Sequence, residues 1–182
     1  MLVKNILLGA AAHMGILEKV RPSIEMSAPP CAESELLLRC YNLVENEVAL
    51  DYIPLICEDT FETDTGVVYY TQLSQKIVRV IGVKDGAGND ISFTIFPEYV
   101  KGQAGKMTVR YAYMPVEKTI DSEVEFKTRV SERLLVYGVI TEYKLAGGYF
   151  EEASVWDAKY KDAVAAAYRA KPSKRISARR WV

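Results

Sequence analysis

Histidine and cysteine are scarce in this chain. It has one histidine, His13, and three cysteines, Cys31, Cys40 and Cys57. A structural zinc site needs four soft ligands in a tight arrangement, and a disulfide framework needs more cysteines at regular spacings. His13 also lacks an adjacent serine or cysteine with which it would form a nucleophile–base pair. We therefore expect no metal site, no disulfide framework, no catalytic residue and no cofactor.

Long uncharged hydrophobic stretches are also missing. No segment approaches the roughly 18 uncharged apolar residues that a membrane-spanning helix needs. Hydrophobic residues make up 49% and charged residues 26% of the 182 residues, as in an ordinary globular protein. We expect a single domain over residues 1–170, a separate short segment over residues 171–182, and no membrane partner.

Acidic residues are absent from residues 171–182, which contain five basic residues. The remaining residues carry 18 basic and 24 acidic side chains, a net charge of −6. A basic end on an acidic body favours binding to an acidic partner, to nucleic acid or to an acidic face of another subunit. Because apolar side chains alternate with the cations, we favour a docking arm over a free tail or a nucleic-acid arm. The residues of this arm are Lys174, Arg175, Ile176, Arg179, Arg180 and Trp181.

Phosphate-binding and calcium-binding motifs are not found. The glycine-rich stretch KDGAGND, at residues 84–90, lacks the GxxxxGK[ST] pattern of a phosphate loop and the carboxylate spacing of a calcium loop. It joins two segments with alternating apolar residues, which is typical of a β-turn. The carboxylates of residues 58–64 are interpreted as a solvated loop. An enzymatic site among them is the weaker alternative, since no cluster of converging groups is visible.

Four helices are predicted from the spacing of apolar residues. Their expected ranges are 3–20, 32–51, 122–146 and 149–169. Pro22 is expected to stop the first helix, and Asp121 or Ser122 to cap the third. Gly147 and Gly148 predict a tight joint, so that the last two helices form an antiparallel hairpin.

The middle of the chain has a period of two instead. Apolar residues alternate with polar ones over residues 77–83, 91–95 and 107–113, and the first two segments are predicted to pair as a β-hairpin. We expect an antiparallel sheet of three to four strands within residues 65–114. The predicted fold class is α+β: a helical bundle of N-terminal helices and a C-terminal antiparallel helix hairpin, with an inserted sheet and an extended C-terminal arm.

The order of these elements resembles that of a known family. The residues concerned are the helix ESELLLRCYNLVENEVALDYIPL, the central sheet, and an ending with ERL and TEY in one helix, then FEEASVWDAKYKDA and a basic tail closing with ARRW. From about residue 32 to residue 182 the chain resembles the head–tail connector adaptor proteins of tailed bacteriophages, also called head-completion or gatekeeper proteins. The larger sheet departs from several such families, which carry helices and a short hairpin.

The resemblance implies a structural protein of the virion neck, assembled in the host cytoplasm. It implies a homo-oligomeric ring, usually of twelve copies, that joins the portal protein to the next neck or tail protein and lets DNA pass without sequence-specific binding. The basic arm would then contact the portal. The candidate contacts to a neighbouring subunit, ring or tail protein are Lys84, Asp85, Asn89, Tyr149 and Trp156. The alternative function is a nucleic-acid-binding protein that uses the basic arm.

Overall fold

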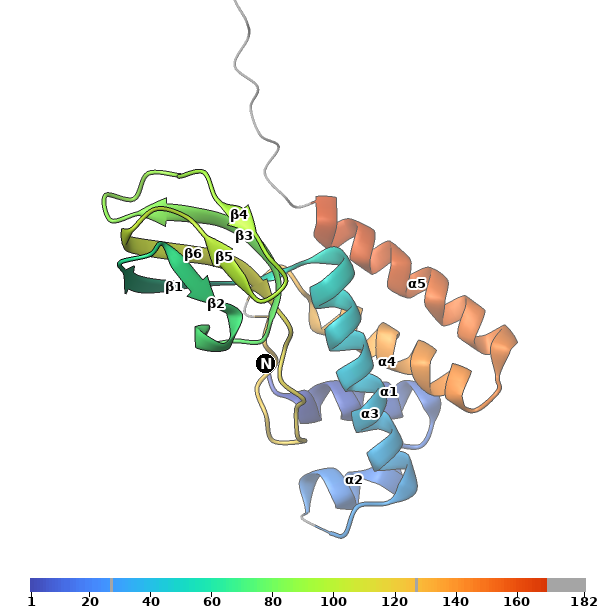
Figure 1. Cartoon of the computed structure of the whole chain (residues 1–182). Coiled ribbons are helices and arrows are strands. Elements are labelled where there is room, and N and C mark those ends of the chain that lie inside the picture. Colours follow the sequence, from blue (N-terminus) through green and yellow to red (C-terminus); the bar gives the residue numbers. More distant parts are fainter. Residues whose placement is uncertain (27, 127, 170–182) are drawn as a thin grey trace, which may run out of the picture.

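The computed structural model describes residues 1–26, 28–126 and 128–169 (Figure 1). The fold is α+β, as the sequence predicts. Helices form one part of the molecule, and two small antiparallel sheets lie together beside it (Figure 1). The predicted arm over residues 171–182 lies outside the described residues, with all six of its proposed docking residues.

Helix α4 lies at the centre of the helical part, where it contacts α1, α3 and α5. Its buried residues Leu134, Val139 and Ile140 pack in one core with Ile6 of α1 and Leu37 of α3. No helix within the described ranges is long and apolar enough to span a membrane. The α-helices of the described chain are α1 (Val3–Met14), α2 (Leu17–Glu25), α3 (Ala32–Glu47), α4 (Glu132–Ala146) and α5 (Phe150–Arg169).

The first predicted helix is in fact two helices. Gly15 ends α1 in the left-handed conformation, with φ of 72°, which glycine adopts without steric cost. The prediction that Pro22 stops the helix was wrong, because α2 continues through it to Glu25. A proline inside a helix removes one backbone hydrogen bond and crowds the carbonyl four residues earlier, and burial of Val20 and Ile24 in the core offsets that cost.

The predicted start of the third helix was also wrong. Helix α4 begins at Glu132, and Ser131 caps it by accepting a hydrogen bond from the Leu134 N–H at 3.2 Å. The segment around residue 122 pairs with the start of the chain instead, since the Val3 N–H donates to the Ser122 carbonyl at 3.0 Å. This pairing satisfies backbone groups that a helix would otherwise have used.

The other two helix predictions were close to the observed bounds. Helix α3 passes into a π-helical turn, η1 (Val48–Tyr52), where the Ile53 N–H donates to the Val48 carbonyl at 2.7 Å. The glycine joint between the last two helices is confirmed, with Gly148 at φ of 77°. Helices α4 and α5 therefore pack as a hairpin (Figure 1).

Both sheets are antiparallel and have three strands each. In the first sheet, β6 lies between β1 and β3, and in the second, β5 lies between β2 and β4. Val83, Met107 and Tyr111 of the first sheet share a second small core with Val68 and Val100 of the other. The strands are β1 (Leu55–Thr63), β2 (Val67–Tyr69), β3 (Ile77–Asp85), β4 (Thr94–Ile95), β5 (Tyr99–Lys101) and β6 (Gly105–Tyr113), with a 3-10 turn, η2 (Tyr70–Gln72), after β2.

The sheet predictions need three corrections. Six strands in two sheets replace the expected three to four strands, and they begin at residue 55 rather than 65. The stretch 58–64, interpreted as a solvated loop, is largely strand β1, in which Cys57 and Phe61 pack against the second core. Strand β3 pairs along its length with β6, and its pairing with the predicted partner is limited to the residues next to the turn, where the Ile91 N–H donates to the Val83 carbonyl at 2.9 Å.

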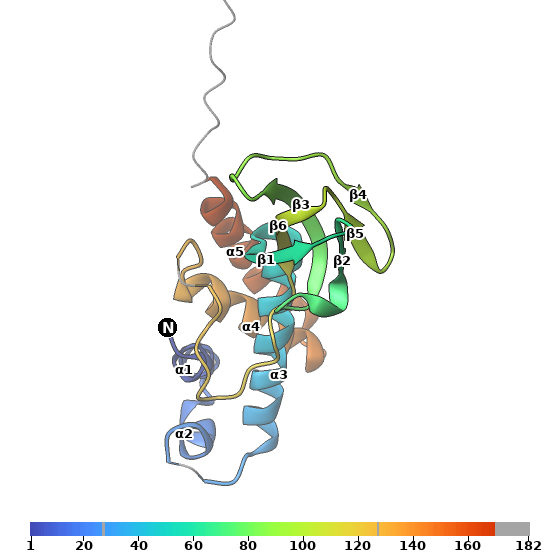
Figure 2. The same cartoon turned by 60° about the vertical axis from the view of Figure 1, so that its left-hand side comes forward.

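The helical part and the sheets are joined by two segments of the chain. One is short and leads from η1 into β1; the other, residues 114–131, runs from β6 along α3 towards α1 before it turns back to α4 (Figure 2). The long segment thus lies against both parts of the molecule. Its contacts with α3 fix where the sheets sit on the helices.

Candidate functional site

The predicted contact residues of the β3–β4 turn bind mainly to one another. The Asp85 carboxylate accepts hydrogen bonds from the Ala87 and Asn89 N–H groups, both at 2.9 Å, and from the Asn89 side-chain amide at 3.1 Å. These hydrogen bonds lower the pKa of Asp85, and those from Asn89 contribute most to the decrease. Lys84 forms an isolated β-bridge with Asp90. Asp85 and Asn89 therefore shape the turn, whichever partner it faces.

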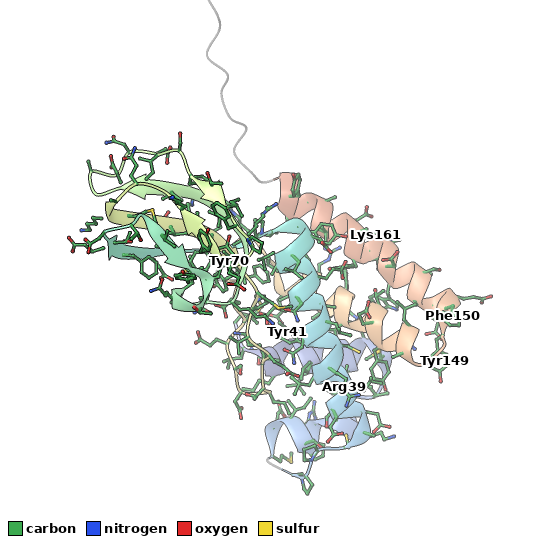
Figure 3. The ribbon with its side chains drawn as sticks, in the orientation of Figure 1. Arg39, Tyr41, Tyr70, Tyr149, Phe150 and Lys161 are labelled. Atoms are coloured by element: carbon green, nitrogen blue, oxygen red, sulfur yellow. The ribbon has the colours of Figure 1, made fainter. Side chains whose placement is uncertain are left out.

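Tyr149 lies at the opposite end of the molecule, at the joint between α4 and α5 (Figure 3). Its side chain is exposed, and that of Phe150 beside it is 68% exposed. The Lys144 ammonium lies 5.0 Å from the Tyr149 ring centroid and pairs with Glu152 at 2.7 Å. We name the exposed group Leu145, Tyr149, Phe150 and Glu151 the hairpin tip.

The exposure of Phe150 does not follow from the helical spacing of apolar residues, which places Phe150 on the apolar side of the last helix. The stretch GGYFEE does contain a signal, because two aromatic residues follow a helix stop directly. Residues at such a joint lie beyond the packed faces of both helices. Monomeric proteins rarely gather exposed apolar side chains, so such a group marks a contact surface.

Trp156 is half-buried and packs within the chain. Its ring lies 5.5 Å from the rings of His13 on α1 and Tyr137 on α4. The Lys159 ammonium lies 4.0 Å from the Trp156 ring centroid, and the Arg133 guanidinium 5.2 Å from that of Tyr137. Trp156 therefore joins three helices, and the surface beside it is formed by the cations that cover the rings.

A hollow of about 410 Å³ lies between the start of α4 and the end of α5. Three cations line it, and none of them forms a salt bridge with a residue that the structure describes. We name it the basic hollow. It is lined by Arg129, Ser131, Arg133, Lys159, Asp162 and the alanines at 163, 166 and 167.

The predicted contact residues thus fall on two separate surfaces. Lys84, Asp85 and Asn89 belong to the sheets, whereas Tyr149 and Trp156 belong to the helix hairpin. The β3–β4 turn and the joint between α4 and α5 lie at opposite ends of the molecule (Figure 1). The structure does not bring them together into one site.

A polar cluster on β1 was the main candidate for enzymatic chemistry. Asp59 accepts hydrogen bonds from the Tyr111 hydroxyl at 2.7 Å and the Ser74 hydroxyl at 2.9 Å. Desolvation opposes ionisation of Asp59, but hydrogen bonds from Ser74 and Tyr111 outweigh it and lower the pKa. Burial raises the pKa of Tyr111 to about 12.

This arrangement anchors a loop rather than activating a nucleophile. The Ser74 hydroxyl donates to an ionised carboxylate, and the cluster supplies no imidazole that would accept the serine proton. Tyr111 stays protonated at neutral pH and also accepts the Gln75 N–H at 3.1 Å. Within residues 1–26, 28–126 and 128–169, no group of three His, Cys, Asp or Glu side chains is placed to hold a metal ion.

The most buried carboxyl group of the described chain is that of Glu45 on α3. Its Oε1 accepts hydrogen bonds from the Tyr41 hydroxyl at 2.8 Å and from the Glu125 N–H at 2.9 Å. Burial raises the pKa of Glu45. The Glu125 side chain in turn binds the Tyr113 hydroxyl at 2.8 Å and Lys118. This network connects α3, segment 114–131 and β6, and the sequence alone did not indicate it.

Neither protein-family models nor curated proteins give a match to this chain. Its function is therefore inferred from the geometry of its surfaces and from the order of its elements.

Proposed function

We propose that this chain is a structural adaptor in the neck of a tailed bacteriophage. In this proposal, copies of the chain form a ring that joins the portal protein to the next neck or tail protein, and DNA passes through the ring. The observation that carries the proposal is the hairpin tip, where Tyr149 and Phe150 are exposed at the end of the α4–α5 hairpin. A pair of exposed aromatic residues is typical of a surface that another chain covers.

The polar clusters of the structure support an assembly role over an enzymatic one. The Asp59 cluster holds the segment before β3 to β6, and the Glu45 network holds segment 114–131 to α3. In both cases the hydrogen bonds link distant parts of the chain. A protein that transmits mechanical load between two rings benefits from such cross-links, since they keep its parts in one arrangement.

The charge distribution is compatible with the passage of DNA. Residues 1–170 carry the net charge of −6, and like charge lowers affinity for phosphates. The basic residues are concentrated at 171–182, which follow α5 directly. In the proposal this arm binds the portal, with Trp181 as the apolar anchor and Arg179 and Arg180 paired with carboxylates.

The test is a pull-down with the portal protein encoded near this gene. Full-length chain is compared with chain that ends at Lys171, and circular dichroism checks that both fold. We expect capture of the full-length chain only, and a Trp181→Ala variant weakened by more than about 1 kcal/mol. Val182→Ala is the matched control at the same end. Equal capture of the full-length and truncated chains would remove the arm from the proposal.

A nucleic-acid-binding protein is the second candidate, favoured by the five basic residues at 171–182. Such an arm would bind DNA weakly and without sequence preference, and binding would fall steeply with added salt. If neither chain binds the portal while the full-length chain retains DNA in a salt-sensitive way, the second candidate replaces the first.

A further inference from the structure

We propose that the hairpin tip of one copy docks into the basic hollow of another copy. This inference rests on the proposed function, in which copies of the chain form a ring, and it names the surfaces through which they meet. It depends on two features at opposite ends of the α4–α5 hairpin. One is apolar and acidic, and the other is basic with a floor of small residues.

The hairpin tip has the features of an inserting element. Phe150 is 68% exposed, more than any other Phe, Tyr or Trp in the described ranges, and Tyr149 beside it is 55% exposed. Glu151 follows in the first turn of α5 and forms no salt bridge with a described residue, whereas Glu152 pairs with Lys144. The tip thus presents two aromatic rings and one carboxylate without an ionic partner.

The basic hollow has the complementary features. Its cations Arg129, Arg133 and Lys159 outnumber its single carboxylate, that of Asp162. The rings of Tyr137 and Trp156 hold Arg133 and Lys159 in place, so less side-chain entropy is lost when they bind an anion. The methyl groups of alanines 163, 166 and 167 leave room for an aromatic ring between the cations.

A hairpin tip that occupies the hollow must come from another copy. Helix α5 has 20 residues and is about 30 Å long at a rise of about 1.5 Å per residue. Since the tip lies at its first turn and the hollow beside its second half, the two cannot meet within one chain. A contact between different patches on identical chains repeats from copy to copy, and it closes into a ring when the rotation allows.

Two other occupants fit the hollow less well. The chain's own end at 171–182 is basic, so its cations would face those of the hollow. Single-stranded nucleic acid would stack its bases on free aromatic faces, but Lys159 covers Trp156 and Arg133 covers Tyr137. An acidic, aromatic segment is the better match in both charge and shape, and the tip is such a segment.

Charge exchange between the two surfaces tests the proposal. One variant carries Glu151→Lys at the tip, and the other carries Arg133→Glu with Lys159→Glu in the hollow. Full-length proteins are studied by sedimentation equilibrium up to about 1 mM, which detects even weak association. We expect the unchanged chain to associate with rising concentration, each variant alone to stay monomeric, and an equimolar mixture to associate again. Glu62→Lys, at an exposed position of β1, is the control and should associate normally.

A photo-cross-link locates the contact. Phe150 is replaced by p-benzoylphenylalanine, and the control places the same residue at Val116, which is also 68% exposed. We expect covalent dimers from the first protein only, linked to residues 129–133 or 159–167. A monomeric unchanged chain, a mixture that does not associate, or cross-links elsewhere would overturn the proposal. So would salt-sensitive DNA binding that the hollow variant loses.

The two proposals fail in different experiments. Sedimentation and cross-linking use this chain alone, whereas the pull-down asks about the portal. Self-association without portal binding would retain the tip and hollow contact and reject the adaptor function. Portal binding by a chain that neither self-associates in sedimentation nor forms the expected cross-link would retain the adaptor function and reject the tip and hollow contact.

Discussion

The Asn42 side chain of α3 binds both backbone groups of Lys118, a residue 76 positions later in the chain. Its Oδ1 accepts the Lys118 N–H at 2.7 Å, and its Nδ2 donates to the Lys118 carbonyl at 3.1 Å. An asparagine amide thus replaces a β-strand partner for one residue of segment 114–131. Together with the Glu45 network, it fixes the connection between the helices and the sheets.

Replacing Asn42 by alanine should lower the free energy of unfolding by about 1–3 kcal/mol, because two partly buried backbone groups lose their partner. Urea denaturation measures the change. Asn46→Ala is the matched control one turn further along α3, since the Asn46 Oδ1 has no hydrogen-bond partner among the described residues. Equal losses in the two variants would contradict the role assigned to the Asn42–Lys118 pair.

The buried Glu45 carboxyl group should make stability depend on pH. Burial raises its pKa in the folded chain above the ordinary value of 4.5. The contribution of Glu45 to folding stability is therefore fully present below about pH 4.5 and decreases as the pH rises through the pKa of the folded chain. The total loss is about 1.4 kcal/mol for each unit by which the folded pKa exceeds the unfolded pKa. Glu45→Gln keeps an acceptor for Tyr41 and the Glu125 N–H but removes the ionisation.

The comparison is made by denaturation of both proteins between pH 4 and pH 8. Relative to the unchanged chain, the Glu45→Gln variant should gain stability as the pH rises from about 4.5 through the folded pKa of Glu45, and the difference should then level off. A difference that stays constant across this range would show that ionisation of Glu45 contributes nothing to folding stability.

Gly138 of α4 should not tolerate alanine. A Cβ at this position would lie 2.6 Å from Cγ1 of Val44 and 3.0 Å from Cε2 of Tyr160, where three helices meet. We expect Gly138→Ala to destabilise the fold by about 1–3 kcal/mol through overpacking, despite the better helix propensity of alanine. Gly9→Ala gains the same propensity with one contact of 3.2 Å, to Val136, and should be nearly neutral. Thermal unfolding of the two variants gives the comparison.

The Tyr111 hydroxyl should protect the loop before β3. Tyr111→Phe removes the hydrogen bonds to Asp59 and from the Gln75 N–H, and we expect a loss of about 1–2 kcal/mol. Hydrogen exchange of the Gln75 amide reports the effect locally and should become faster. In Tyr69→Phe, which removes an exposed hydroxyl without a described partner, exchange at Gln75 should not change. If exchange is also unchanged in Tyr111→Phe, the hydroxyl does not anchor this loop.

Local patterns along the chain were sufficient for the fold class and for most of the helices. The spacing of apolar residues located α3 and α5, and Gly147 with Gly148 marked the joint between the last two helices. These signals are short-range, because helix periodicity and the conformational freedom of glycine act within a few residues. The alternation in residues 107–113 likewise located β6.

What the local patterns could not supply were the partners of each segment. Strand β1 contains Glu58, Asp59 and Glu62 and was interpreted as a loop, because the order of residues does not show that β6 pairs with it. The start of α4 was misplaced for the same reason, since residues near 122 pair with the start of the chain. The basic hollow and the Glu45 network also join residues far apart in sequence. Backbone pairing, burial and surface charge depend on which distant residues meet, and this is decided by the packing of the whole chain.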